Sequence, residues 1–133
     1  MDCSLIFYAA RKTSLCEKTL RKGFAPLGVR VASSCFANSA QTLGERLCEA
    51  FGSHQIAVII GGLDFTDDRS IVGIISRAAA GSHPELVRRL PHPDGGGYLL
   101  RAGSQLLLLL PDEPSRVETI LRGTLADYMK TTV

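Results

Sequence analysis

Two uninterrupted apolar runs of strand length constrain the fold of this chain more than any other feature. Ile56–Ile60 and Leu106–Leu110 each contain five apolar residues, well short of the roughly 18 residues that a membrane span requires. A strand is apolar at every position when both of its faces are covered, as in a parallel sheet. The runs therefore predict buried strands with helices packed on both sides.

Further strand-like runs surround these two and alternate with segments of helical spacing. Strands are predicted at Ser4–Ala10, Val29–Phe36, Gln55–Ile60, Tyr98–Arg101 and Gln105–Leu110. The alternation predicts one α/β domain over residues 1–133. We expect a three-layer, mostly parallel, doubly wound sheet with helices on both faces and an antiparallel edge near residues 98–110.

The helices are predicted from apolar spacing and from capping residues. The first helix opens at Ser14, with Glu17 in a capping box, and ends at Pro26 and Gly28. The second helix is capped by Asn38 or Ser39 and stops at Gly52. Further helices are predicted at Arg69–Ala80, at His83–Leu90 and from Ser115, where Glu118 would be the capping-box partner of Ser115. The expected apolar faces are Cys16, Leu20, Phe24 and Leu27; Leu43, Leu47, Ala50 and Phe51; and Val117, Ile120, Leu121, Leu125 and Tyr128.

Composition excludes several classes of protein. The formal net charge is +2, with acids and bases interspersed, which is too weak and too scattered for a nucleic-acid partner. The 4 cysteines form no C-x-x-C pair and the 3 histidines lack zinc-site spacing, so we expect small apolar side chains and loop histidines. No membrane span is predicted, and Met1-Asp2-Cys3 lacks the basic region of a signal peptide. These observations predict a cytoplasmic protein that binds no membrane.

The loop after the central strand is the first candidate site. Gly61 and Gly62 follow Ile60 directly, and glycine lets a backbone adopt positive φ and approach a ligand closely. The helix expected next would offer free N–H groups and a positive dipole end to an anion. In an open parallel sheet, ligands bind at this carboxyl end of the strands. By residue type, Asp67 and Asp68 are explained first as caps of that helix; the functional alternative is that they hold Mg²⁺ beside a phosphate.

A second candidate is the proline-framed turn from Pro111 to Pro114, which is either a stiff connector or the opposite wall of the same site.

A search for a nucleophile finds serines and Cys35 near the end of the second strand, but no G-x-S-x-G elbow and no histidine placed to pair with them. We therefore expect no covalent catalysis. Receiver and flavodoxin-like domains share the alternating pattern, but they require other residues after the first strand.

Two short patches resemble the molybdopterin-binding (MoaB/Mog-type) domain family, with the amino-terminal domain of CinA as the nearest branch. Ile56–Leu63 followed by Thr66–Ser70 is similar to the family's G-G-L-G-P-T-x-D-D segment, and Leu106–Pro114 is similar to its strand and L-P-G-x-P signature. The resemblance covers most of the chain in element order, but specific residues match only in these patches.

The resemblance implies a ligand and a set of site residues. The family binds or adenylates molybdopterin using Mg-ATP, and the CinA branch hydrolyses diphosphate linkages such as that of ADP-ribose. The residues carried over for ligand binding are Gly61, Gly62, Leu63, Thr66, Ser70, Pro111 and Pro114. Asp67 and Asp68 would be the catalytic acids, with Asp67 binding Mg²⁺. No covalently bound cofactor is implied, and a homo-oligomer, such as a trimer, is expected.

Three departures from the family pattern leave the activity open. The segment after the first strand, Ala9–Lys12, has no acid; Asp64 stands in place of a glycine; and Asp112 replaces the glycine of L-P-G-x-P. A negative charge at 112 would repel a phosphate. The alternatives are therefore a ligand-binding or transfer protein, a non-catalytic oligomeric relative that lost the site, and a Mg²⁺-dependent nucleotide pyrophosphatase.

Overall fold

The computed structural model describes residues 1–62, 86–90, 92–93, 96–102, 105–123, 125 and 128. The elements within these ranges are β1 (Asp2–Tyr8), α1 (Thr13–Phe24), a 3-10 helix (Ala25–Leu27), β2 (Arg30–Ala37), α2 (Ala40–Ser53), β3 (Ile56–Ile60), β4 (Leu86–Leu90), β5 (Gly97–Ala102), β6 (Gln105–Leu110) and α4 (Pro114–Arg122). None of the helices in the described ranges has the length and apolarity of a membrane span.

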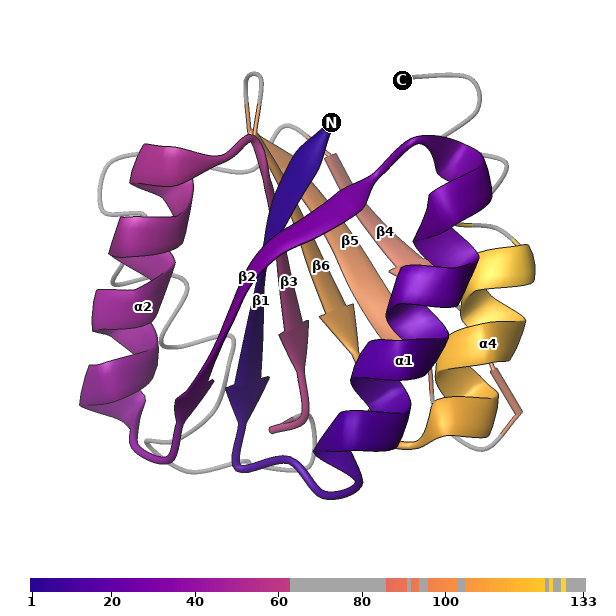
Figure 1. Cartoon of the computed structure of the whole chain (residues 1–133), viewed down its shortest axis with the longest axis horizontal. Coiled ribbons are helices and arrows are strands. Elements are labelled where there is room, and N and C mark those ends of the chain that lie inside the picture. Colours follow the sequence, from indigo (N-terminus) through magenta and orange to yellow (C-terminus); the bar gives the residue numbers. More distant parts are fainter. Residues whose placement is uncertain are drawn as a thin grey trace.

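The six strands form one sheet in the order β2-β1-β3-β6-β5-β4. Neighbours from β2 to β6 pair in parallel, whereas β5 is antiparallel to both β6 and β4. Figure 1 shows α2 on one side of this sheet and α1 with α4 on the other. The predicted three-layer α/β fold, mostly parallel with an antiparallel edge near residues 98–110, is confirmed.

The central strands β3 and β6 are buried along their whole apolar runs, as the sequence predicts. Their register pairs Ile56 with Leu106 and Ile60 with Leu110. Because alternate residues of a strand point to opposite faces, the side chains of each strand divide between two cores. Ile56, Val58 and Ile60 pack in the core under α1 and α4, and Ala57 and Ile59 pack under α2.

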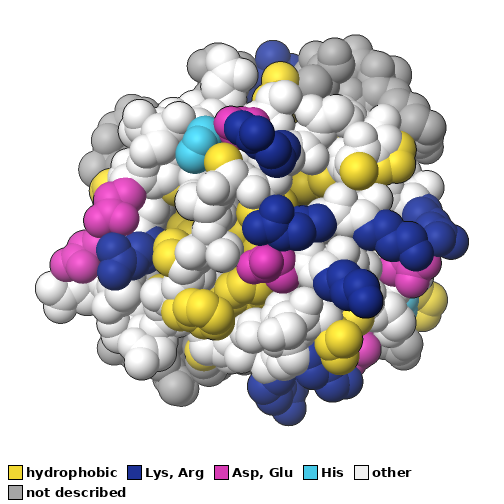
Figure 2. Space-filling model, viewed as in Figure 1, with side chains coloured by type: hydrophobic (Ala, Val, Ile, Leu, Met, Phe, Trp, Pro, Cys, Tyr) yellow, Lys and Arg dark blue, Asp and Glu magenta, His cyan; other side chains and the backbone are white. Residues whose placement is uncertain are grey.

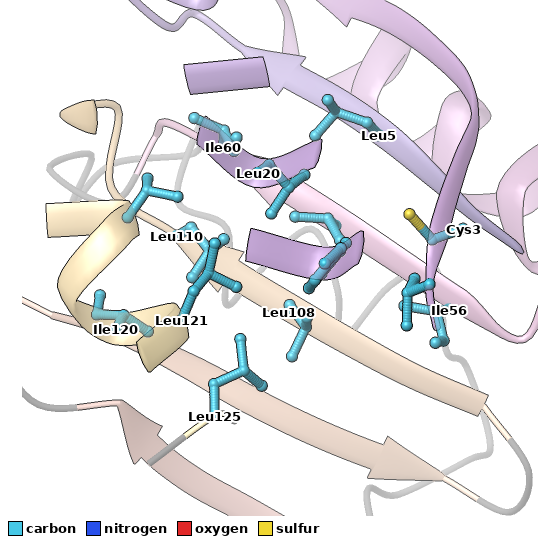
Figure 3. Packing of buried hydrophobic residues seen from close by; sticks show 14 of the residues in the cluster. Cys3, Leu5, Leu20, Ile56, Ile60, Leu108, Leu110, Ile120, Leu121 and Leu125 are labelled. Atoms are coloured by element: carbon cyan, nitrogen blue, oxygen red, sulfur yellow. The ribbon is translucent and has the colours of Figure 1, made fainter. Parts of the chain in front are cut away.

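The helices bury the apolar faces expected of them. In Figure 3, Leu20 of α1 and Ile120 and Leu121 of α4 pack over Leu108 and Leu110 of β6. The predicted faces are buried at Cys16, Leu20, Phe24, Leu43, Leu47, Ala50, Val117, Ile120, Leu121, Leu125 and Tyr128, and Leu27 and Phe51 are partly buried against the cores.

The start of α2 is capped as predicted. The Ser39 hydroxyl accepts a hydrogen bond from the Thr42 amide at 3.2 Å, which satisfies one of the unpaired N–H groups of the first turn. The helix ends at Ser53, one residue beyond the predicted stop at Gly52.

The structure corrects one predicted element type and moves the bounds of β1 by two residues and those of β2 and β5 by one. The sequence predicts a short helix at His83–Leu90, but Leu86–Leu90 is the edge strand β4, paired with β5. β1 covers Asp2–Tyr8 rather than Ser4–Ala10, because Asp2 already pairs with Arg30 on β2 and the backbone turns to a positive φ of 48° at Ala9. The predicted helix Arg69–Ala80 lies outside the described residues.

Both predicted capping boxes are wrong. α1 begins after Lys12, which makes no side-chain cap and has a φ of 53°. α4 begins at Pro114, so its N-cap is Glu113 and Ser115 is already inside the helix. Glu118, the expected partner of Ser115, instead forms an ion pair with Arg122 at 2.8 Å.

The edge strand β2 crosses the face shown in Figure 2. An apolar strip runs diagonally along this face, and side chains of both charges are interspersed around it. Phe36 is 65% exposed at the end of β2 and stacks on Phe7, with ring centroids 5.2 Å apart. The mixing of charges on this face agrees with the scattered charges of the sequence.

Candidate functional site

The carboxyl ends of β1, β2, β3 and β6 meet at one rim of the sheet. Register aligns Tyr8 with Ala37, Phe7 with Ile60, and Ile60 with Leu110. The amino termini of α1, α2 and α4 follow directly from this rim, at the bottom of Figure 1. From β1 the chain moves outward to β2 and then returns to β3 on the other side of β1, so the topological switch point lies between β1 and β3, where ligands of open α/β sheets bind.

Gly61 lies at this switch point and is buried. Its φ is 102°, and its amide donates to the Leu110 carbonyl at 3.0 Å. A Cβ placed on Gly61 would lie 2.5 Å from the Tyr8 carbonyl oxygen and 2.9 Å from the Ala10 Cβ. Close contact with the protein's own β1–α1 loop therefore explains why residue 61 must be glycine, whether or not a ligand binds.

Gly62 differs from its neighbour because it is half-buried, with a φ of 73°. Because Gly62 has no side chain, its backbone is partly exposed to solvent at the switch point. The other residues predicted for this loop, Leu63, Thr66, Asp67, Asp68 and Ser70, lie outside the described residues. Among the residues that are described, no three His, Cys, Asp or Glu side chains come together to hold a metal ion.

The proline-framed turn after β6 forms the other side of the rim. Pro111 is buried and Pro114 occupies the first turn of α4, where the missing N–H of proline costs no hydrogen bond. The backbone between them is held by the Val117 amide, which donates to the Glu113 carbonyl at 3.0 Å. The turn therefore brings Asp112 and Glu113 to the amino terminus of α4.

Four charges connect this turn to the β1–α1 loop. The Arg11 amide donates to Asp112 Oδ2 at 3.0 Å, and the Arg11 guanidinium Nε lies 3.5 Å from the same oxygen. Lys12 Nζ donates to Glu113 Oε2 at 2.7 Å. The hydrogen bond from Lys12 lowers the pKa of the Glu113 carboxyl, so this acid stays ionised at a lower pH than an ordinary glutamate. We call these four residues the rim bridge.

A serine–histidine contact at the opposite end of the sheet is absent from the sequence-based predictions. Ser4 Oγ lies 2.7 Å from His54 Nδ1, and Ser33 Oγ lies 3.5 Å from Ser4 Oγ. Ser4 is only 5% exposed, so its hydroxyl is a poor nucleophile for an external substrate. The contact joins the start of β1 to the residue after α2, and the register of β1 against β3, which pairs Cys3 with Ile56, is the signal needed to find it.

A groove with a volume of about 520 Å³ lies between α1 and α4, away from the rim. It is lined by Lys18, Thr19, Lys22, Gly23, Pro26, Leu27, Glu118, Leu121 and Arg122. None of the predicted site residues is among them. Lys22 and Arg122 belong to the last turns of their helices, where basic side chains are stabilised by the helix dipole.

Comparison with solved structures matches this architecture along nearly the whole chain. The CinA protein of unknown function from Thermoplasma acidophilum superposes with a TM-score of 0.75 at 16% identity, covering 95% of this chain and 96% of that one. The molybdopterin biosynthesis enzyme MoaB from Thermus thermophilus gives a TM-score of 0.69 at 14% identity, covering 98% and 94%. The chain has the MoaB/Mog-type fold. The Mog protein of Mycobacterium ulcerans gives 0.69 at 15% identity, covering 100% of both chains.

The predicted resemblance to MoaB/Mog-type domains is thus confirmed at the level of fold. No protein-family model and no curated protein matches the chain in sequence. Two of the departures from the MoaB/Mog-type pattern, the bases after β1 and the acid at 112, contact each other in the rim bridge.

The 4 cysteines are free, with Cys3 and Cys16 buried and Cys48 exposed. Burial raises the pKa of the Cys3 thiol to about 12 and that of Cys16 to about 11, so neither forms a thiolate readily.

We predict that a thiol reagent at pH 8 modifies the exposed Cys48 rapidly, and reaches Cys3 and Cys16 only after unfolding. Cys48→Ser should remove the fast phase. Rapid modification of all 4 cysteines in the native protein would contradict the observed burial.

Proposed function

We propose that this chain binds a small phosphate-bearing pterin or nucleotide at the rim, as a protein of molybdopterin biosynthesis or a close functional relative. The observation that carries the proposal is the switch point between β1 and β3, where half-buried Gly62 takes a positive φ at the rim from which α1 and α4 begin. A backbone free of side chains next to helix amino termini suits an anionic group. The molybdopterin biosynthesis enzyme MoaB shares this fold, and we therefore favour a pterin as the ligand.

The remaining roles follow the predicted residues. Gly62, Leu63, Thr66 and Ser70 would line the phosphate loop, and Pro111 and Pro114 would shape the opposite wall. Asp67 and Asp68 would supply carboxylates to Mg²⁺ or to the hydroxyl and amino groups of the ligand, with Asp67 as the metal ligand. Gly61 would support this loop through its contact with Tyr8 and Ala10, instead of touching the ligand.

Titration calorimetry with molybdopterin and with Mg-ATP tests this proposal. We expect Asp67→Ala to weaken binding of Mg-ATP by about tenfold or more, or about 1.4 kcal/mol, because it removes the carboxylate proposed to hold Mg²⁺ beside the phosphates. Asp2→Ala, at the opposite end of the sheet, is the matched control and should bind as the wild type does. Absence of binding across pterins and nucleotides at millimolar concentration would contradict the proposal.

One observation favours a second candidate, a non-catalytic oligomeric relative that kept the fold. The rim bridge places Asp112 and Glu113 on positive groups that an anion would otherwise use. This candidate predicts a homo-oligomer in light scattering and an unchanged melting temperature with every nucleotide and with Mg²⁺. A ligand at about 100 times its Kd would instead add about 2.7 kcal/mol of stability, and the resulting rise in melting temperature would exclude this candidate.

A further inference from the structure

The rim bridge connects two loops that are distant in sequence and that lie on either side of β3. The residues of each pair are 101 positions apart. β1 and β6 are the two neighbours of β3 in the sheet, so the loops that follow them meet beyond the end of β3, on the side of α1 and α4. The same end of β3 leads into Gly61 and Gly62.

Within this bridge, each carboxylate occupies a position suited to a bound anion. Asp112 accepts the Arg11 amide, one residue before the N-cap of α1, and also lies beside the Arg11 guanidinium. Glu113 accepts from the Lys12 ammonium. An amide, a guanidinium and an ammonium together are the donor groups that bind phosphate oxygens. Here the protein's own acids already occupy them.

The bridge is also open to solvent, which makes it reversible. The side chain of Arg11 is 83% exposed and that of Lys12 is 53% exposed, against 23% for Asp112 and 33% for Glu113. Ion pairs of such exposure are weak and are screened by salt. The bridge can therefore hold the loops together at rest and still yield to a competing anion of higher charge.

We propose that the rim bridge is an electrostatic latch in which Asp112 and Glu113 compete with an anionic ligand for Arg11 and Lys12. The inference rests on the proposed function, since it describes how access to the same rim is controlled. A ligand diphosphate displaces the two carboxylates, binds the freed cations and separates the β6–α4 loop from the β1–α1 loop. The affinity for the ligand thus depends on how much more strongly its phosphates interact with Arg11 and Lys12 than Asp112 and Glu113 do.

The experiment measures binding of inorganic pyrophosphate by the whole chain at low salt. The latch predicts that D112N/E113Q binds about three to ten times more tightly than the wild type. The matched control D2N/E49Q removes two negative charges away from the rim, one at the start of β1 and one on α2, and its affinity should stay within about twofold of the wild type. R11Q/K12Q should bind more than tenfold more weakly. Melting curves confirm that each variant is folded, and Glu113→Gln alone, which keeps Asp112 in place, should give a smaller gain in the same direction.

The outcomes separate the latch from the proposed function. Equal pyrophosphate affinity of the wild type and D112N/E113Q would overturn the latch while leaving binding at the rim intact. An equal gain in D2N/E49Q would also overturn it, because net charge and not the bridge would then control affinity. If neither protein binds pyrophosphate, the bridge closes no anion site and the inference fails; the calorimetry with molybdopterin and Mg-ATP then decides the proposed function separately.

Discussion

Replacing Gly61 with valine is expected to lower the free energy of unfolding by about 2–5 kcal/mol. A residue with a Cβ loses about 1–2 kcal/mol in the left-handed region, and overpacking a tight site costs about 1–3 kcal/mol more. Both apply here, because φ is 102° and the added Cβ would lie 2.5 Å from the Tyr8 carbonyl oxygen. That oxygen belongs to the backbone and cannot move aside as a side chain can.

Urea denaturation measures this effect, and α2 offers a control. Gly44 lies in the helix with nothing within 4 Å of its Cβ position, so Gly44→Ala should stabilise the protein by up to about 1 kcal/mol. A Gly61→Val variant as stable as the wild type would show that the β1–α1 loop does not press on residue 61.

Truncating Leu108 to alanine is expected to cost about 2–5 kcal/mol, the range for a leucine in a closed core. Leu108 is 0% exposed, in the middle of β6 beneath α1 and α4. The matched control is Leu15→Ala, since Leu15 is 57% exposed on α1 and its truncation should change stability by no more than about 0.5 kcal/mol. Similar losses from both variants would contradict the position of β6 at the centre of the sheet.

The sheet and the buried helix faces could be predicted because their signal is local. An apolar residue at every position of β3 and β6 indicates burial on both faces, and helical spacing at Cys16, Leu20 and Phe24 indicates one packed face. Such patterns are contained in short stretches of sequence and need no knowledge of the partner element.

The wrong predictions depend on partners far along the chain. Leu86–Leu90 is a strand because β5 supplies an antiparallel partner, and its five residues carry too little periodicity to show this. The start of α1 is shifted because the Asp112 carboxylate, contributed by another loop, receives the Arg11 amide. At α4, the fixed φ of Pro114 sets the first turn and overrides the capping preference of Ser115.

The candidate site was predictable only in part, for the same reason. The sequence identified the strand end and both glycines, but assigned one cause to the pair. The structure gives Gly61 a packing role, which depends on the close approach of Tyr8, at the end of β1, and Ala10, in the following loop. The rim bridge has no local signal in the sequence, because Arg11 and Asp112 are 101 positions apart and come together only in the folded sheet.

The most direct test of the account is to locate ligand binding by NMR. Backbone amide shifts of labelled protein, titrated with Mg-ATP, should change most at Arg11, Gly61, Gly62 and Asp112, around the rim. The amides of Ser4 and His54, at the opposite end of the sheet, should remain unchanged. Shifts confined to the groove between α1 and α4, or no shifts at saturating nucleotide, would contradict binding at the carboxyl ends of the strands.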